Sequence, residues 1–246
     1  MSKKSQKMKK FIFNRLILIC VAMSSFSSCV VYHPHNVNVP LLRERGEMQL
    51  EANVSTTIPF LLSPSLNASY AYAPINMLGL QASGSFTDGQ NMFGQVAAGT
   101  FHTFGSSVLE CYVGYGRGVS SGGKNNDLNQ NSYSVDGSYG LVFGQVDFGW
   151  RQLADNSIDV GMAMKAGVLN PSWEKRQIAD DDTETVVDEL KDPHFLLEPQ
   201  LVFRFGIEKV KFTVNMAYSF IDGWPTDNSY FNYERFSVGI GVNYCF

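Results

Sequence analysis

Along most of the chain, apolar and polar residues alternate with a period of two, which is typical of β-strands whose two faces meet different surroundings. In residues 46–57 (GEMQLEANVSTT), for example, Met48, Leu50 and Val54 lie on one face and acidic or amide side chains lie on the other. This alternation predicts about ten strands. They are residues 46–57, 66–72, 77–86, 91–104, 108–119, 138–152, 158–169, 195–205, 210–221 and 230–246.

The connections between these strands are alternately long and short. The long set is 58–64, 87–90, 120–137, 170–194 and 222–229, and the short set is 73–76, 105–107, 153–157 and 206–209. Outer-membrane barrels have short periplasmic turns, longer external loops and an even number of strands. We therefore predict an all-β fold for residues 46–246, namely a transmembrane up-and-down antiparallel β-barrel of about ten strands (about 8 to 12).

The less apolar face of the strands is predicted to line a narrow lumen, and the apolar face to meet outer-membrane lipids. Small residues suit such a lumen, and its acidic and basic residues nearly balance, because unpaired buried charge is costly. The predicted lumenal charge network consists of Glu47, Glu51, Glu110, Asp147, Arg151, Asp159, Lys165, Glu198, Arg204, Lys211 and Arg235.

Aromatic residues gather where alternate strands reach the side of the short turns, as in the interfacial girdles of membrane barrels. They are Tyr70, Tyr72, Phe148, Trp150, Phe203, Phe205, Tyr244 and Phe246. Lipid excludes open sheet edges, so the first and last strands must pair and close the wall. We expect a monomer.

Residues 1–28 are predicted to be a secretory signal peptide, with a basic start, a short apolar run and small residues before Cys29. The tripeptide Ser27-Ser28-Cys29 resembles a lipobox, in which Cys29 becomes a lipidated first residue and the lipid anchor. Ordinary cleavage after Ser24 is the alternative. Residues 29–45 are expected to form a lipid-anchored linker to the barrel.

The composition agrees with an exported membrane barrel. Of the 246 residues, 44% are hydrophobic and only 17% are charged, below the roughly 25% of soluble domains. The net charge of −4 gives no reason to expect nucleic acid as a partner. By strand parity Cys111 and Cys245 fall on opposite faces of the wall, so we expect no disulfide between them.

Two segments carry a family resemblance. The tail 236–246 (FSVGIGVNYCF) looks like the C-terminal signal of outer-membrane barrels, and this resemblance implies that Tyr244 and Phe246 are read by the barrel assembly machinery. Residues 37–52 (VNVPLLRERGEMQLEA), behind Cys29, resemble small outer-membrane β-barrel lipoproteins of the Bacteroidota. That family is largely uncharacterised, so the resemblance implies a location and an assembly route but no chemistry.

Two motifs point only weakly to ligands. Residues 118–124 (GVSSGGK) nearly match a phosphate-binding loop, but Asn125 stands where the motif needs Ser or Thr, and no helix-forming segment follows. His33 and His35 are too few for a closed metal site. We therefore expect an external loop and linker residues at these places, and neither a cofactor nor a metal.

A lipid-modifying barrel enzyme, such as a lipid A deacylase or palmitoyltransferase, would need a histidine near a serine and an acid. His194 is a weak catalytic candidate behind the acidic loop 180–192, whereas His102 falls near the periplasmic end. The acidic loop lacks the spacing of a calcium site and is expected to be solvated. Trp173 and Trp224, in external loops, could contact a partner or anchor at the interface.

The sequence thus favours a non-enzymatic outer-membrane protein of the Gram-negative envelope, whose external loops serve surface interaction or envelope integrity. Two alternatives stay open. One is an outer-membrane enzyme acting on lipid or lipopolysaccharide and centred on His194, and the other is a narrow channel that uses the lumenal charges.

Overall fold

The computed structural model describes residues 30–58, 64–87, 91–126, 132–178, 184–223 and 232–246. The elements are β1 (Val30–Tyr32), β2 (Met48–Ile58), β3 (Ser65–Ile75), β4 (Leu78–Thr87), β5 (Asn91–Phe104), β6 (Ser107–Asn126), β7 (Ser132–Gln152), α2 (Leu153–Asn156), β8 (Ile158–Ile178), β9 (Glu184–Leu190), β10 (His194–Gly206), β11 (Val210–Tyr218), β12 (Phe220–Ile221), β13 (Asn232–Tyr233) and β14 (Phe236–Cys245). Within these ranges no helix is long and apolar enough to cross a membrane.

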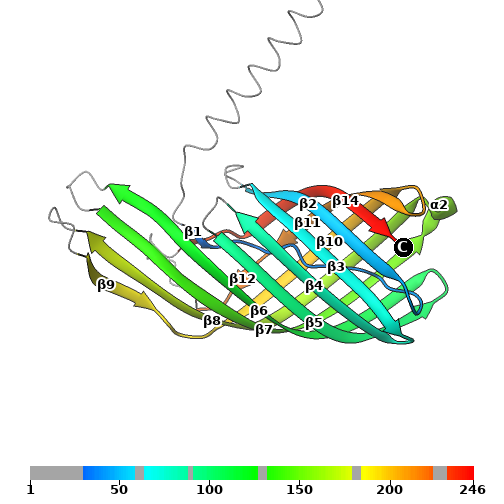
Figure 1. The fold of residues 1–246 in the computed structure, drawn as a ribbon, viewed down its shortest axis with the longest axis horizontal. Coiled ribbons are helices and arrows are strands. Elements are labelled where there is room, and N and C mark those ends of the chain that lie inside the picture. Colours follow the sequence, from blue (N-terminus) through cyan, green and yellow to red (C-terminus); the bar gives the residue numbers. More distant parts are fainter. Residues whose placement is uncertain (1–29, 59–63, 88–90, 127–131, 179–183, 224–231) are drawn as a thin grey trace, which may run out of the picture.

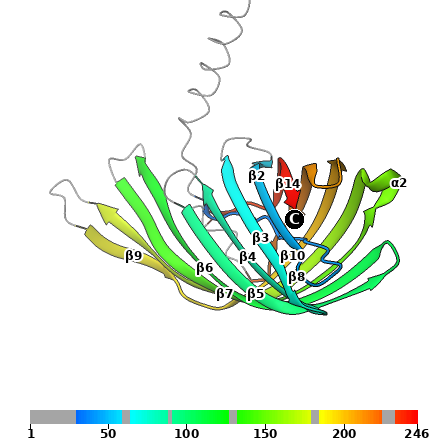
Figure 2. The ribbon, with the colours of Figure 1, turned by 45° about the vertical axis from the view of Figure 1, so that its right-hand side comes forward.

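Ten of the strands close into one antiparallel barrel, as predicted (Figures 1 and 2). Around the wall the order is β2, β3, β4, β5, β6, β7, β8, β10, β11 and β14. β14 pairs with β2, so the last strand meets the first, and Ile240 lies opposite Val54 in this seam. β8 pairs directly with β10, so that β9 stands outside the closed wall.

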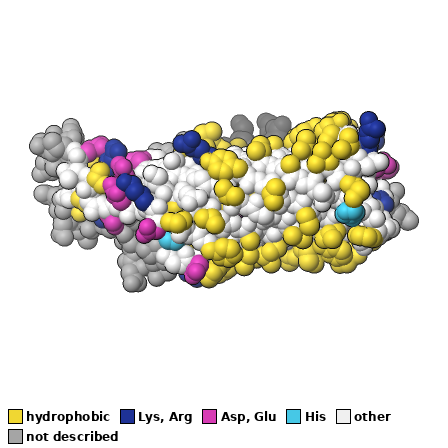
Figure 3. All heavy atoms as spheres, turned by 90° about the horizontal axis from the view of Figure 1, so that it is seen from below, with side chains coloured by type: hydrophobic (Ala, Val, Ile, Leu, Met, Phe, Trp, Pro, Cys, Tyr) yellow, Lys and Arg dark blue, Asp and Glu magenta, His cyan; other side chains and the backbone are white. Residues whose placement is uncertain are grey.

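Apolar side chains of the wall point away from the barrel axis. Ile240 is 66% exposed and Phe212 is 59% exposed, whereas Lys211 and Thr213, on either side of Phe212, are buried. Hydrophobic side chains are spread over the barrel wall in Figure 3, and acidic and basic ones gather toward its two ends. The predicted assignment of the two faces is confirmed by this alternation.

The two ends of the barrel differ. One end, called the short-turn end below, carries the tight turns after β3, β5 and β10, the helical turn α2, and the C-terminal Phe246. At the opposite end, called the hairpin end, β6, β7, β8 and β9 continue beyond their neighbours. The pairing of β5 with β6 stops at Val119, and that of β10 with β8 stops at Leu169, whereas β7 and β8 pair on to Ile178.

The prediction of long loops at 120–137 and 170–194 is therefore wrong. Most of their residues extend the four strands into a sheet beyond the barrel wall. The period-two pattern weakens there because the outer face of the sheet meets water instead of lipid and carries polar residues, although the inner face still buries Val135 and Trp173.

A charge on the outer wall should destabilise the barrel in lipid more than the same charge beyond the wall. Ile240 lies at the middle of β14, whereas Ile207, in the turn before β11, is 70% exposed. Ile240→Arg should reduce the stability of the barrel in lipid by about 2–4 kcal/mol, and the control Ile207→Arg by at most about 1 kcal/mol. Urea titration of vesicle-refolded protein, followed by the heat-modifiable gel band, measures both. Equal losses would contradict a lipid-facing Ile240.

Candidate functional site

The barrel interior holds part of the chain's own N-terminal region, residues 32–42, called the lumenal segment below. Most of its side chains are buried, including those of Val37, Val39 and Leu41. In Figure 1 the blue chain after β1 runs lengthwise through the barrel toward the end that carries the C-terminus. Sequence analysis expected residues 29–45 to be a lipid-anchored linker to the barrel, and residues 32–42 of this stretch lie inside the barrel.

The lumenal segment spans the whole lumen. At the hairpin end, β1 pairs in parallel with β13, and the Tyr32 hydroxyl donates to a Glu198 carboxylate oxygen over 2.8 Å. At the short-turn end, the Gly46 N–H donates to the Ala73 carbonyl over 2.7 Å, beside the turn between β3 and β4. The chain therefore crosses from one mouth of the barrel to the other before β2 begins.

Side chains of the wall hydrogen bond the main chain of the lumenal segment. Gln200 does so twice, because its Oε1 accepts from the N–H of Val37 and its Nε2 donates to the Val37 carbonyl, each over 2.7 Å. Gln145 Nε2 donates to the Asn38 carbonyl over 2.8 Å. A buried main-chain group without a partner costs about 1–3 kcal/mol, so these amides fix the position of the segment.

Near the short-turn end the segment bends around one buried carboxylate. The N–H groups of Leu41 and Leu42 donate to the two oxygens of Glu110, over 2.9 and 2.7 Å. Arg151 donates to the Leu41 carbonyl over 3.0 Å. Leu41 has a φ of 54°, in the left-handed region that is strained for a residue with a branched side chain. The three hydrogen bonds offset that strain and hold the bend.

Glycines of the wall leave room for the segment's apolar side chains. A Cβ atom added at Gly161 would lie 3.1 Å from Val39 Cγ1, and one added at Gly149 would lie 2.6 Å from Leu41 Cδ1. Carbon atoms in ordinary contact are about 3.5–4.0 Å apart. The wall and the segment are therefore shaped for each other, in apolar packing as well as in hydrogen bonding.

Most of the predicted lumenal charge network exists as ion pairs, and two of the pairs are joined because Arg151 also lies 4.0 Å from Asp159. Removing one partner of such a buried pair leaves an uncompensated charge, which costs about 3–5 kcal/mol. The pairs are Arg204 with Glu51 (2.8 Å), Lys211 with Asp159 (2.6 Å), Lys165 with Glu198 (3.4 Å) and Arg151 with Glu47. Arg204 also donates to the carbonyl of Val39 in the lumenal segment, over 2.8 Å.

Three predicted members of the network behave differently. Glu110 and Asp147 lie opposite each other on β6 and β7, and both are fully buried. Neither is in an ion pair among the described residues. Glu110 accepts from the lumenal segment, and Asp147 accepts from Gln145 Nε2 over 2.8 Å. Arg235 was wrongly predicted, because its side chain is exposed and lies over the Tyr233 ring at 5.5 Å.

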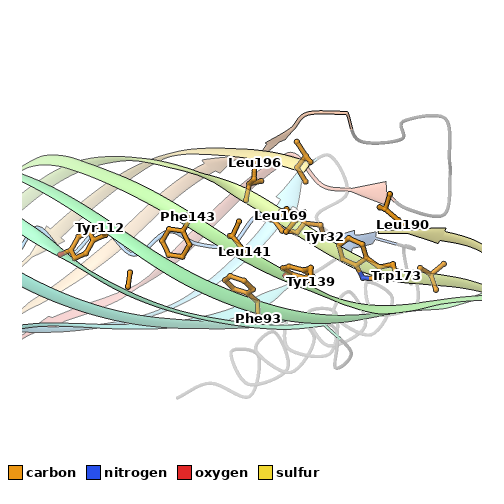
Figure 4. Close-up of a cluster of buried hydrophobic side chains, with 13 residues drawn as sticks. Tyr32, Phe93, Tyr112, Tyr139, Leu141, Phe143, Leu169, Trp173, Leu190 and Leu196 are labelled. Carbon is orange, nitrogen blue, oxygen red and sulfur yellow. The ribbon is translucent and has the colours of Figure 1, made fainter. Parts of the chain in front are cut away.

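Aromatic and aliphatic side chains fill the lumen from its middle to the hairpin end (Figure 4). His35 stacks on Phe93 with ring centroids 3.7 Å apart, and Tyr32 meets Tyr139 edge-on at 5.4 Å. Sequence analysis missed this cluster, although a signal existed in the inward positions of the strand predicted at 138–152. The other members are Ala97, Tyr112, Val135, Leu141, Phe143, Leu169, Trp173, Leu190, Leu196 and Ile221.

His33 and His35 belong to the sealed lumen. His33 Nδ1 lies 2.7 Å from a Glu234 carboxylate oxygen. His35 Nε2 lies 2.6 Å from the Tyr139 hydroxyl, and its Nδ1 lies 3.2 Å from Ser85 Oγ. Within the described ranges, no group of three or more His, Cys, Asp or Glu side chains is arranged to hold a metal ion.

The weak catalytic candidate His194 is buried at the start of β10, and its Nδ1 lies 3.1 Å from the carbonyl oxygen of Asp222. Of the acidic residues that motivated the candidate, 180–182 lie outside the described residues, and Glu184 is exposed at the start of β9. His102 is exposed near the short-turn end, as its position in the sequence predicted.

The other residues that the sequence singled out are two tryptophans, the motif at 118–124 and two cysteines. Trp173 is fully buried and donates to Ser120 Oγ over 2.5 Å, so it neither faces a partner nor anchors in lipid. Trp224 lies outside the described residues. Residues 118–124, which nearly match a phosphate-binding loop, lie within strand β6. Cys111 is exposed and Cys245 is buried, and both are free thiols.

Comparison with known proteins places the fold. No family model and no curated sequence matches the chain. The outer membrane protease OmpT of Escherichia coli superposes with a TM-score of 0.56 at 8% identity, over 82% of this chain and 94% of OmpT. The translocator domain of autotransporter NalP from Neisseria meningitidis gives a TM-score of 0.45 at 10% identity, over 98% of this chain and 97% of that domain. The chain has the fold of an outer-membrane β-barrel.

Removing the Glu110 carboxylate should loosen the lumenal segment. Glu110→Ala deprives the amides of Leu41 and Leu42 of their acceptor, and hydrogen bonds to a charged group contribute about 1.5–3 kcal/mol. Hydrogen–deuterium exchange of these amides should accelerate roughly ten- to a hundredfold. Glu44→Ala, at an exposed position beyond the bend, is the control and should leave exchange unchanged. Unaltered protection in Glu110→Ala would show that other contacts hold the segment.

Proposed function

We propose that the protein is a non-enzymatic outer-membrane barrel, sealed by its own N-terminal segment, whose external strands serve surface interaction or envelope integrity. The observation that carries this proposal is the occupied lumen. Residues 32–42 fill the barrel from mouth to mouth, and wall side chains bond their main-chain groups. A barrel filled in this way acts as a rigid support for what lies outside the membrane.

The occupied lumen argues against the narrow-channel alternative. A channel needs a continuous polar path, but an aromatic and aliphatic cluster fills the hairpin half of this lumen. The basic residues that would line such a path are in contact with carboxylates or with the lumenal segment. At the short-turn mouth, a cavity of about 490 Å³ is lined by Arg43, Glu47 and Arg151, among others, and no residue of the lumenal segment 32–42 lines it.

The enzyme alternative has no support in the described residues. OmpT is a protease, but a likeness at 8% identity concerns the fold alone. A hydrolytic site would need a nucleophile, a base and an orienting acid. His35 contacts Ser85, but its other ring nitrogen faces the Tyr139 hydroxyl instead of a carboxylate. The space beside His35 is about 10 Å³, room for about one water molecule and not for a substrate.

The sheet beyond the barrel is the surface that we propose to contact partners. β9 has β8 as its single partner strand among the described elements, so its other edge is open. Val186 and Val187 in β9 are 44% and 45% exposed. An open edge outside the membrane can accept an extended strand of another protein, while nearby charges such as Asp188 and Glu189 limit indiscriminate pairing.

Two further features belong to the proposal. Tyr244 and Phe246 are exposed at the short-turn end, where the barrel assembly machinery would read them as an insertion signal. Cys29 would be a lipid anchor, as expected of an outer-membrane lipoprotein of the Bacteroidota. Neither feature requires a cofactor.

Conductance tests the seal. The full chain should give no ion current in a planar lipid bilayer, because the lumenal segment and the aromatic cluster block the path. Deleting residues 30–42 should produce discrete conductance steps, with the heat-modifiable gel band as the check that the barrel still forms. Current through the full chain would overturn the proposal in favour of a channel. A silent deletion variant would show that the wall side chains close the lumen unaided.

Shortening the external sheet tests the surface role. Replacing residues 174–189 by a short turn removes β9 and the end of β8 without touching the barrel wall. We expect cells that carry this variant to become more sensitive to detergent. The double variant Val186→Thr, Val187→Thr keeps the open edge and should retain most of the resistance, because strand addition uses main-chain groups. Unchanged sensitivity after shortening would exclude a role in envelope integrity.

A further inference from the structure

The direction of the lumenal segment has a consequence for the chain that precedes it. Residues 32–42 run from the hairpin end toward the short-turn end, and β2 starts at the short-turn end. Because β1 pairs with β13 at the hairpin mouth, Val30 is held at the end opposite to the C-terminal Phe246. The first described residue, Val30, therefore lies at the hairpin end of the barrel.

The hairpin end faces the outside of the cell if the barrel is oriented as its loops indicate. Outer-membrane barrels keep their short turns and their C-terminus in the periplasm. Here the short turns, α2 and Phe246 share one end. This orientation is part of the proposed function, and the inference below rests on it.

Among the described residues, the lumen leaves no room for a second strand beside residues 32–42. Ten peptide steps span at most about 35 Å, so residues 32–42 are long enough to cross the roughly 25 Å height of the apolar band of a membrane barrel. Beside this single chain, the free space near His35 is about 10 Å³. Since Tyr32, Tyr139 and Trp173 close the hairpin half, a second strand does not fit.

We propose that the N-terminus of the exported chain is displayed on the cell surface, threaded outward through the barrel that follows it. A lipid on Cys29 would then enter the membrane from the outer leaflet, since Cys29 directly precedes Val30 at the outer mouth. The lumenal segment is fixed in the barrel, because wall side chains hydrogen bond its main chain along its length. They are Glu110, Gln145, Gln200 and Arg204.

Disulfide trapping tests the path of the lumenal segment through the barrel. In a Cys111→Ser, Cys245→Ser background, Val39→Cys and Gly161→Cys place two thiols close together, because a Cβ atom at Gly161 lies 3.1 Å from Val39 Cγ1. The boiled protein should run faster without reductant than with it. The control pair Val39→Cys, Met162→Cys should not, because Met162 faces lipid. Absence of the Val39–Gly161 cross-link in the folded barrel would overturn the threaded path.

Epitope accessibility tests whether the chain before Val30 is displayed on the cell surface. One epitope is inserted between Cys29 and Val30, a second within 127–131, between the ends of β6 and β7 that lie at the hairpin end, and a third between Asn156 and Ser157 at the short-turn end. On intact cells, antibody should bind the first two as fully as after permeabilisation, and the third only after permeabilisation. The heat-modifiable band shows that each variant folds.

The three positions separate the two ways in which the inference could fail. If the 127–131 epitope is hidden on intact cells and the short-turn epitope is exposed, the orientation assumed in the proposed function is wrong. If those two behave as expected and the epitope before Val30 is hidden, surface display of the N-terminus is wrong and the orientation stands.

Discussion

An extended chain inside a barrel has no strand beside it, so each of its main-chain N–H and C=O groups must find a side chain of the wall or water. This constraint governs the interior of the protein. A β-strand in the wall satisfies its groups with its neighbours, but the lumenal segment must rely on single side chains. Gln200 meets both groups of Val37, and Glu110 meets two successive N–H groups at the bend. The polar residues of the wall therefore define the route of the segment.

The same requirement explains why the lumenal charges form small separate sets. Each set is complete only when the segment is present. Arg204 shares its donors between Glu51 and the Val39 carbonyl, and Glu198 accepts from Tyr32 as well as from Lys165. Without the segment, Glu110 would face Asp147 across the strand pair with few donors nearby. Segment and wall thus stabilise each other, and neither has its full set of hydrogen bonds alone.

The wall was predictable from the sequence because lipid imposes a strict alternation on its outer face. Phe212 and Ile240 show this alternation, because each is an apolar residue between polar or glycine neighbours. Beyond the membrane the outer face of a strand meets water and no longer has to be apolar, so the extensions of β6, β7 and β8 lost the alternation and were predicted as loops, although their inner face buries Val135 and Trp173. The placement of Trp173 failed for that reason, since its strand position was not recognised.

The lumenal segment escaped prediction for a different reason. Apolar and polar residues alternate along a strand only where its two faces meet different surroundings. The lumenal segment is enclosed by the wall on all sides, so its sequence shows no such alternation. Its residues 37–42 (VNVPLL) are nevertheless too apolar for a solvated linker, and wall positions such as Gly149 and Gly161 are small without a turn to explain them. An apolar stretch before the first strand, together with unexplained small residues and unpaired acids on the polar face, is the signal that could have revealed it.

Connectivity also dictates when the lumen is filled. The lumenal segment leads into β2, and β2 pairs with β14, the strand of the wall that comes latest in the described chain. Until β14 arrives, the sheet is open along β2, and the segment can lie against the polar face of the wall. Threading after closure would require the segment to pass Tyr139 and Trp173 with its polar groups unbonded, at a cost of about 1–3 kcal/mol for each group. That cost is avoided if the lumenal segment is already in place when β2 and β14 pair. The pairing that closes the wall then also encloses the lumenal segment.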